Sequence, residues 1–214
     1  MKYFPLFADL SGRRVLVVGG GEVGERKVRL LVEAGAHVDL VAPELSPALA
    51  AAVAAVDPRP LPGAGRVTLR SASFDDAQLD EVVLAVAATD DRSINARVAA
   101  AANSRGRLVN VVDDAELSGF IVPAIVDRSP LVIAVSTGGV APVLARLVRE
   151  RIESVLDESV GALASLFERW RSRIRAALPD VGRRRRWYET AVRDGAAMYL
   201  RRGDVAAAER WIES

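Results

Sequence analysis

The N-terminal half of the chain alternates between short apolar runs and longer amphipathic stretches. Residues 15–18 are Val-Leu-Val-Val, and residues 82–88 form a second continuous apolar run. Apolar runs of this length are typical of parallel strands that are buried on both faces. Between them, residues 22–34 place apolar side chains at helical spacing among Glu, Arg and Lys. The pattern therefore predicts an α/β domain in which strands and helices alternate around a parallel sheet.

This pattern predicts five strands within residues 1–114. The expected strands are residues 13–18, 37–42, 67–70, 82–88 and 108–112, and the expected helices are residues 22–34, 46–56 and 93–104. Residues 57–65 are rich in Pro and Gly, so we expect a loop there, and residues 76–80 suit a turn or a short helix. Right-handed crossovers between the strands would give a doubly wound sheet.

A glycine-rich turn joins the first expected strand to the first expected helix. Residues 19–24 are Gly-Gly-Gly-Glu-Val-Gly and contain the pattern G-x-G-x-x-G. Gly19 permits the tight turn, Gly21 lets the backbone approach a pyrophosphate, and Gly24 lets the helix pack close to the strand. The helix N-terminus then offers N–H groups and a positive dipole end to the phosphates. The strand–turn–helix context predicts a Rossmann-like NAD site, and the alternative is a glycine turn that binds no nucleotide.

Polar residues follow the second, fourth and fifth expected strands. Glu44 lies about twenty residues past the glycine turn, where an acid holds the ribose hydroxyls of NAD and repels the extra phosphate of NADP. Glu44 also suits a cap of the helix at residues 46–56, and the sequence does not separate the two roles. Asp39 is a poorer candidate because it falls inside a strand. The loop that begins at Thr89 should face the cofactor, because ligands of doubly wound sheets lie beyond the strand carboxyl ends.

After residue 114 the pattern changes. Residues 120–126 and 131–136 are apolar runs separated by Asp-Arg-Ser-Pro, which predicts a β-hairpin. Strongly apolar strands outside the main sheet need a cover, and a second subunit is one way to supply it. From Pro142 onward the pattern is helical, with Pro in the first turn. We therefore expect a dinucleotide-binding domain at residues 1–114, a dimerisation and central segment at 115–149, and an α-helical domain at 150–214.

Composition narrows the class of protein. Half of the 214 residues are hydrophobic, the net charge is +1, and there is no cysteine and a single histidine, His37. Disulfides, thiolate nucleophiles and a protein-built metal site are therefore not expected, and His37 suits a structural role in its strand. The N-terminus does not read as a signal peptide, and no apolar run has the length of a membrane span. A soluble cytoplasmic protein is the expectation.

The basic excess lies at the C-terminal end and consists of arginine. Residues 151–214 hold 13 basic and 10 acidic side chains, including the run at residues 183–186 that precedes Trp187 and Tyr188. Arginine binds carboxylates and phosphates through paired N–H groups, so a polyanionic ligand or a solvated helix surface would explain the excess. Acidic residues are interspersed along the same helices, which argues against nucleic-acid binding.

Short motifs in a fixed order run along nearly the whole chain. They are Pro5-Leu6-Phe7, residues 17–23, Arg26-Lys27, residues 87–91, Asn95, residues 110–113, Phe120-Ile121, Pro123-Ala124, and residues 127–131, 136–139 and 142–146. With these motifs the chain resembles the precorrin-2 dehydrogenase / sirohydrochlorin ferrochelatase module of siroheme synthases. In some members a methyltransferase domain follows, and the chain ends before it, so we expect the stand-alone form.

The resemblance implies an activity, a cofactor and partners. It implies NAD-dependent oxidation of precorrin-2 to sirohydrochlorin, and in some members insertion of ferrous iron to give siroheme. It also implies a homodimer whose interface includes the hairpin and the helical tail. Because the sequence offers no metal-ligand cluster, the macrocycle itself would supply most of the ligands to an inserted iron.

The resemblance also implies roles for particular residues. Asp113, at the end of the Asn-Val-Val-Asp motif, is the expected catalytic carboxylate. The tetrapyrrole carries many carboxylates on its rim, so cations are expected in its site, with ion pairs and solvated charges as the alternative. The expected cofactor contacts are Gly19, Gly21, Glu22, Val23, Gly24, Pro43, Glu44, Thr89 and Asp90, and the expected substrate contacts are Arg128, Thr137, Arg146 and Arg149.

Two departures from the family pattern are visible, and two alternative functions stay open. Ala141 stands where the family often has serine, and the loop at residues 57–66 is longer than usual. One alternative is a dehydrogenase without chelatase activity. The other is a non-catalytic dimer that senses a dinucleotide.

Overall fold

A computed structural model describes residues 2–55 and 64–214 of the chain. It divides into two compact units, Met1–Val122 and Pro123–Ser214, and each is described by itself. Most of the loop expected at residues 57–65 lies outside the described residues.

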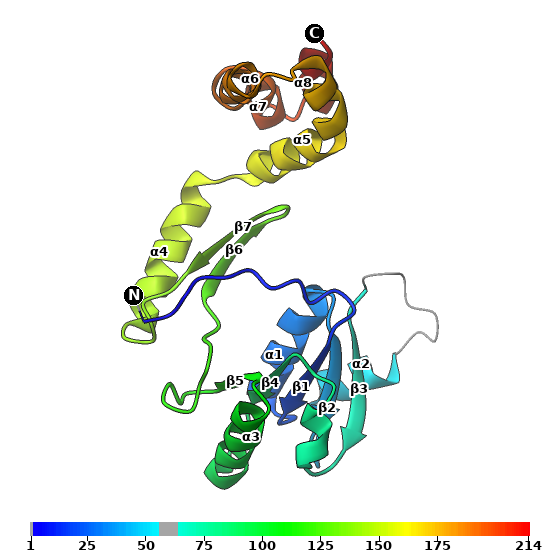
Figure 1. Ribbon diagram of the computed structural model, residues 1–214, viewed down its shortest axis with the longest axis vertical. Helices are drawn as coiled ribbons and strands as arrows, with labels where there is room; N and C mark the ends of the chain where they lie inside the picture. Colours follow the sequence, from blue (N-terminus) through cyan, green and yellow to red (C-terminus); the bar gives the residue numbers. More distant parts are fainter. Residues whose placement is uncertain (1, 56–63) are drawn as a thin grey trace. The chain divides into compact units, whose positions relative to one another are not determined.

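The first unit is built on a five-stranded parallel sheet with the order β3-β2-β1-β4-β5 (Figure 1). Its strands are β1 Arg14–Val18, β2 His37–Val41, β3 Arg66–Ser71, β4 Leu84–Ala87 and β5 Leu108–Val111, and its helices are α1 Glu22–Glu33, α2 Pro47–Ala54, the 3-10 helix η1 Asp76–Leu79, and α3 Arg92–Ser104. The strand order reverses between β1 and β4, which is where doubly wound sheets bind their ligands. The predicted Rossmann-like fold is confirmed.

Both faces of this sheet are buried because the strands have few polar positions. On β1, Val15 and Val17 pack toward α1 and α2, whereas Leu16 and Val18 pack toward α3 and η1. This alternation follows from the two-residue period of a strand. A strand without polar positions therefore packs into the hydrophobic core on each face of the sheet. Both cores hold the strand in place, and so they also hold the sheet edge at which the strands end.

Asp39 is the charged exception on β2. It is nearly buried and accepts hydrogen bonds from Arg14 Nη2 at 2.6 Å and from Arg70 Nε at 2.7 Å. Arg14 also pairs with Glu81. Burying a carboxylate is costly unless it is paired and hydrogen-bonded, and two guanidinium groups satisfy Asp39 here. Asp39 therefore has a structural role across the three strands β1, β2 and β3.

The first unit ends after Val122 rather than after residue 114. The residues between return to β5: Gly119 donates its N–H to the Val109 carbonyl at 2.8 Å, and Ser118 Oγ accepts the N–H of Val111 at 2.9 Å. Because these bonds complete the edge of β5, the segment belongs to the sheet and not to the hairpin that follows.

The second unit begins with the predicted hairpin. Strands β6 Ala124–Arg128 and β7 Leu131–Val135 pair antiparallel, and helix α4 Pro142–Val155 packs against both. Val126 and Ala145 are the buried residues of this layer. The first strand starts four residues later than the apolar run at residue 120 suggested, because Phe120 is still engaged with Val109 of the sheet.

Four further helices complete the second unit, as the pattern predicted. They are α5 Glu158–Ala177, α6 Val181–Arg193, α7 Ala196–Arg201 and α8 Val205–Glu213. Their core consists of Leu, Ile and Ala from α5, α7 and α8 with aromatic side chains against it, among them Phe167 and Trp187. Gly195 has no room for a side chain, since a Cβ there would lie 2.5 Å from the Trp211 ring.

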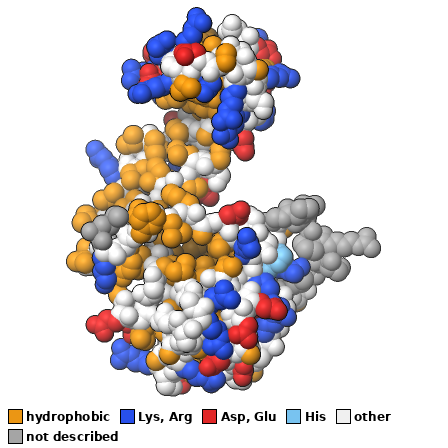
Figure 2. Space-filling model, viewed as in Figure 1, with side chains coloured by type: hydrophobic (Ala, Val, Ile, Leu, Met, Phe, Trp, Pro, Cys, Tyr) orange, Lys and Arg blue, Asp and Glu red, His pale blue; other side chains and the backbone are white. Residues whose placement is uncertain are grey.

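Helix α4 exposes one apolar face. Val140 just before the helix and Val143, Leu144, Leu147 and Val148 within it are all exposed, at the spacing of one helical stripe. Figure 2 shows apolar side chains gathered over this part of the second unit, whereas arginine and acidic side chains are mixed over the helical region α5–α8. An exposed apolar patch of this kind marks an interaction surface.

Candidate active site

The turn between β1 and α1 is packed so tightly that three of its four glycines have no room for a side chain. A Cβ would lie 2.3 Å from the Ala88 carbonyl oxygen at Gly19, 2.1 Å from the Glu44 carbonyl oxygen at Gly20, and 2.1 Å from the Gly19 carbonyl oxygen at Gly24. Gly19 also has a φ of +124°, a backbone angle that residues with a side chain rarely adopt. These contacts bring the ends of β1, β2 and β4 together around the turn.

Gly21 is different, because a Cβ there would meet no heavy atom of the described residues within 4 Å. Gly21 is the N-cap of α1 and provides no side chain to the first N–H groups of that helix. The N–H groups of Glu22, Val23 and Gly24 lie in the first turn, where a helix has no internal acceptor. Open space above unpaired N–H groups fits a diphosphate, so the observed geometry suits the expected dinucleotide.

The loop after β2 is fixed to the glycine turn. Ser46 donates its N–H to the Gly20 carbonyl at 2.8 Å, and its hydroxyl donates to Glu25 at 2.6 Å. Ser46 also caps α2 by accepting the N–H of Leu49. The alternative role of Glu44 as the cap of this helix is therefore wrong. Glu44 and Pro43 are exposed beside the glycine turn, which is compatible with the expected contact to a ribose.

The loop after β4 is held by a buried amide. Asn95 accepts from the Thr89 hydroxyl at 2.8 Å and donates to the Thr89 carbonyl at 2.8 Å. Asp91 caps α3 by accepting hydrogen bonds from the hydroxyl and the N–H of Ser93, and these bonds lower the pKa of Asp91. Asp90 and Asp91 are both exposed, and the Asp91 side chain is engaged in the cap of α3. Thr89 is consequently fixed at the carboxyl end of β4, next to the glycine turn.

Asp113 follows β5 and is exposed at the same edge of the sheet. Its φ of 59° lies in the left-handed region, and it is the only described residue other than glycine found there. Asp tolerates this conformation better than most residues. Asp113 and Val112 border a hollow of about 430 Å³, whose other wall is formed by α1.

Lys27 of α1 also lines this hollow. Burial lowers the pKa of Lys27, the neighbouring Arg26 lowers it further, and the carboxylate of Asp113 raises it. Lys27 therefore shares the electrostatic environment of Asp113. Sequence reasoning assigned no role to Lys27, although its position four residues after Val23 and three before Leu30 places all three on one helix face.

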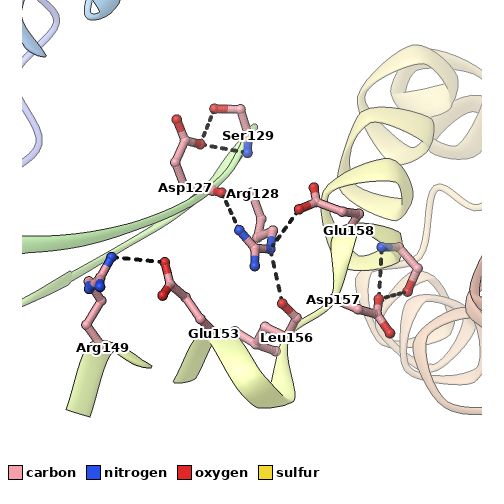
Figure 3. Close-up of polar contacts among 9 residues, drawn as sticks. Asp127, Arg128, Ser129, Arg149, Glu153, Leu156, Asp157 and Glu158 are labelled. Carbon is pink, nitrogen blue, oxygen red and sulfur yellow. Dashed lines mark hydrogen bonds and ion pairs between the residues drawn. The ribbon is translucent and has the colours of Figure 1, made fainter. Parts of the chain in front are cut away.

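Arg128 lies in the second unit and is engaged in local contacts (Figure 3). Its Nε donates to the Leu156 carbonyl at 3.1 Å and lies 3.4 Å from Glu158, and its Nη1 donates to the Asp127 carbonyl at 3.0 Å. Its side chain is only 18% exposed. These contacts connect the hairpin to the junction of α4 and α5, so they favour the structural role that the sequence left open for Arg128.

Of the other three expected substrate residues, Thr137 precedes α4, and Arg146 and Arg149 lie within it. The Thr137 hydroxyl accepts the N–H of Ala141 at 3.1 Å. Arg146 is exposed and lies 3.7 Å from Glu150, and Arg149 donates to Glu153 at 3.3 Å. Both ion pairs connect successive turns of the same helix, where they contribute little to stability.

Over residues 2–55 and 64–214, the His, Asp and Glu side chains form no group of three that would hold a metal ion. Over the same residues, no helix combines the length and apolar character needed to cross a bilayer.

The parallel sheet and the glycine turn at its switch point define a dinucleotide-binding protein of the Rossmann class. Comparison with family models agrees. Residues 6–124 match the model described as putative NAD(P)-binding, residues 128–154 match the sirohaem biosynthesis protein central region, and residues 159–214 match the sirohaem synthase dimerisation region. The chain therefore belongs to this NAD(P)-binding family, in the form found in siroheme synthases.

Curated relatives are similar over the whole chain. Siroheme synthase 1 of Yersinia enterocolitica is 47% identical over 213 residues, siroheme synthase of Chromobacterium violaceum is 48% identical over 213 residues, and siroheme synthase 1 of Cronobacter sakazakii is 50% identical over 214 residues. In each case all of this chain is covered, but only 43% or 44% of the relative. The chain thus spans less than half the length of these relatives.

A solved structure matches nearly all of the chain. SirC, a precorrin-2 dehydrogenase, superposes with a TM-score of 0.72 at 25% sequence identity, covering 98% of this chain and 100% of that one. Both units of the present structure therefore have counterparts in that protein.

Proposed function

We propose that this protein catalyses the NAD-dependent oxidation of precorrin-2 to sirohydrochlorin. The observation that carries the proposal is the shared sheet edge: the open glycine turn after β1 and the carboxylate after β5 lie at the carboxyl ends of one parallel sheet. The likeness to a precorrin-2 dehydrogenase over 98% of the chain supports it. The proposed substrate is the one for which that dehydrogenase is named.

The cofactor would be held mainly by backbone groups. The N–H groups at the start of α1 face the open space at Gly21 and would receive the diphosphate. Glu44 would accept hydrogen bonds from the ribose hydroxyls, and the loop at Thr89 and Asp90 would border the nicotinamide half. When bound, NAD supplies the hydride acceptor, which no side chain of the protein provides.

Asp113 would handle the proton. Oxidation of precorrin-2 removes a hydride from carbon and a proton from elsewhere on the macrocycle, so a base is needed beside the ring. An exposed carboxylate at the end of β5 accepts that proton directly or through one water. The alternative, in which Asp113 only shapes the turn, is distinguished by substituting asparagine, which preserves the turn but not the base.

The direct test is anaerobic incubation of the protein with precorrin-2 and NAD while absorbance is followed. We expect NADH and sirohydrochlorin to appear in equal amounts. Absence of NADH formation by folded protein that binds NAD would contradict the proposal and favour the dinucleotide-sensing alternative.

Insertion of ferrous iron into sirohydrochlorin is a separate proposal. It is supported by the name siroheme synthase that the relatives carry, and by the position of Asp113, whose carboxylate would take up the pyrrole protons that leave as iron enters. Iron here is a substrate. Anaerobic addition of ferrous iron to sirohydrochlorin with and without the protein measures this step, and an unchanged rate would leave a dehydrogenase alone.

We also propose a homodimer that uses the exposed face of α4. Its support is the apolar stripe on that helix and the match of residues 159–214 to a model described as a dimerisation region. Light scattering after size-exclusion chromatography should give twice the chain mass, and Leu144→Glu together with Leu147→Glu should give the mass of one chain. A wild-type monomer would contradict the proposal.

A further inference from the structure

The hollow beside Asp113 extends along α1 from Val23, the residue that it shares with the glycine turn. It has a volume of about 430 Å³ and is formed entirely by the first unit. One wall comes from α1, from Val23 in its first turn to Glu33 in its last, and the other is the end of β5 with Asp113. Besides Asp113, its lining includes the cations Arg26, Lys27 and Arg29 and the apolar side chains of Val23 and Leu30.

The cations of this hollow differ in whether they have an acidic partner. Arg29 lies 4.0 Å from Glu33 in the next turn of the helix, which partly neutralises it. Arg26 and Lys27 form no hydrogen bond or ion pair through their side chains with any described residue. Lys27 is half-buried, and Arg26 beside it repels it. A half-buried lysine beside an exposed arginine of the same charge favours the arrival of an anion.

The placement of these cations distinguishes the two anions that the enzyme would meet. The diphosphate of NAD is expected at the first turn of α1, where the helix N–H groups are unpaired. Arg26 and Lys27 lie in the next turn and, with Val23 and Leu30, occupy the helix face that borders Asp113. This face also offers apolar side chains, which suit the edge of a macrocycle better than a phosphate.

We propose that this hollow binds a peripheral carboxylate of the tetrapyrrole, with Arg26 and Lys27 as its donors. The inference rests on the proposed function and names a substrate subsite within it. Arginine provides two parallel N–H groups to the carboxylate, and lysine provides a compact charge. A carboxylate fixed there holds the adjoining ring edge next to Asp113, so the subsite orients the substrate toward its base.

The test uses substitutions that remove charge with little change in length. Arg26→Gln and Lys27→Gln are compared with Arg13→Gln, which makes the same charge change at the opposite end of the sheet, just before β1. For each variant, KM for precorrin-2, kcat, the Kd of NAD and the Kd of sirohydrochlorin are measured. Thermal unfolding by circular dichroism confirms that each variant folds.

We expect KM for precorrin-2 and the Kd of sirohydrochlorin to rise about tenfold in each single variant, as for loss of one charged hydrogen bond. We expect kcat to change less than about threefold and NAD affinity to be unaffected, since only substrate binding is lost. Arg13→Gln should match the unmodified protein. Lys27→Arg should restore affinity, and added salt should weaken sirohydrochlorin binding in the unmodified protein more than in the double variant.

Three results would overturn the inference. Unchanged KM and sirohydrochlorin affinity in both Gln variants would show that the cations do not meet the substrate. A rise in the Kd of NAD would assign them to the dinucleotide, and a fall in kcat alone would make Lys27 a partner of Asp113. Because sirohydrochlorin binding needs no turnover, the subsite is tested even if the unmodified protein fails to oxidise precorrin-2 and the proposed function falls.

Discussion

The sheet edge of the first unit and the hairpin–α4 layer of the second differ in how their candidate residues are used. At the sheet edge, glycine contacts and backbone N–H groups leave an open space at Gly21, and the Asp113 side chain is exposed beside a hollow. In the second unit, the expected substrate residues Arg128, Thr137 and Arg149 form contacts within their own layer. The first region is thus arranged to receive a ligand, and the second mainly to stabilise itself and to present an apolar face.

The first region is built from backbone groups, whereas the arginines of the second pair with acids nearby in the same unit. A glycine turn excludes side chains whether or not a nucleotide is present. An arginine on a helix acquires a glutamate one turn away, as Arg146 does with Glu150. Substitutions in the two regions should therefore differ in their effects, and we expect the largest effect at the sheet edge.

Asp113→Asn should produce the largest loss. Asn tolerates the left-handed backbone, so the turn after β5 should keep its conformation while the base is removed. We expect kcat for precorrin-2 oxidation to fall about 100- to 10,000-fold, the usual contribution of a general base. Steady-state kinetics and NAD titration measure this, and NAD affinity should be unchanged. A variant with full kcat would remove catalysis from the sheet edge.

Gly21→Ala and Gly24→Ala form a matched pair within the glycine turn. The first adds a methyl group to open space, so we expect normal stability and NAD affinity weakened by about tenfold or more, since backbone and pyrophosphate approach closely there. The second places the methyl group 2.1 Å from the Gly19 carbonyl oxygen, so we expect about 1–3 kcal/mol of destabilisation. Denaturant unfolding and NAD titration separate the two. Equal behaviour of both variants would contradict the assignment of Gly21.

Asp39→Asn tests a purely structural charge in the first unit. It removes the carboxylate partner of Arg70 and one of the two of Arg14, which still pairs with Glu81, and both arginines are partly exposed, at 45% and 32%. We therefore expect a loss of about 1–2 kcal/mol, below the cost of breaking a fully buried pair. Urea unfolding monitors it, and kinetics at a temperature where the variant is folded should match the unmodified protein. A change in KM for NAD would instead give Asp39 a role in the site.

Arg128→Gln and Arg146→Gln test whether these two charges of the second unit have a structural role. Arg128 loses its bond to the Leu156 carbonyl and its pairing with Glu158, so we expect about 1 kcal/mol of destabilisation. Arg146 is 64% exposed, and its loss should change stability by less than about 0.5 kcal/mol. Should Arg128→Gln keep full stability and raise KM for precorrin-2, its expected role as a substrate contact would stand.

The smallest effect concerns two matching helix caps, one in each unit. Asp91 before α3 and Asp157 before α5 each accept hydrogen bonds from a serine two residues later, and these bonds lower both pKa values below the ordinary 3.8. The stability that they contribute is complete above about pH 3.8 and is lost as the pH falls through the folded-state pKa. Asp91→Asn and Asp157→Asn should each flatten acid unfolding below pH 3.8. An unchanged acid limb in both would contradict this.

Much of the fold was predictable because it is encoded locally. The β-branched run before Gly19 and the continuous run at residues 82–88 specify buried parallel strands, and the glycine spacing specifies the turn. The boundary after Val122 was not predictable, because it depends on hydrogen bonds between residues 118–120 and β5 that leave no periodic signal.

Within the candidate site, residues at the ends of strands could be predicted from the sequence. Residues whose role depends on a tertiary contact could not. Asp113 was proposed from the family resemblance, and its position after a strand fits that proposal. Ser46 as the true cap of α2 was missed, since Glu44 and Ser46 both suit a helix start and only the geometry separates them. Lys27 received no role because its nearness to Asp113 depends on how α1 crosses the sheet.

The pairing of Asp39 with two strands fixes more than stability. Asp39 lies opposite Leu16 of β1 and Thr68 of β3, on the face that packs toward α3. A register shift of β2 by one residue would place the Asp39 carboxylate on the opposite face of the sheet, among the Val and Leu side chains that pack against α1. The carboxylate would then be buried away from Arg14 and Arg70. The ion pairs of Asp39 therefore also fix the register of β2 against β1. This register keeps Glu44, which follows β2, beside the glycine turn that would bind the dinucleotide.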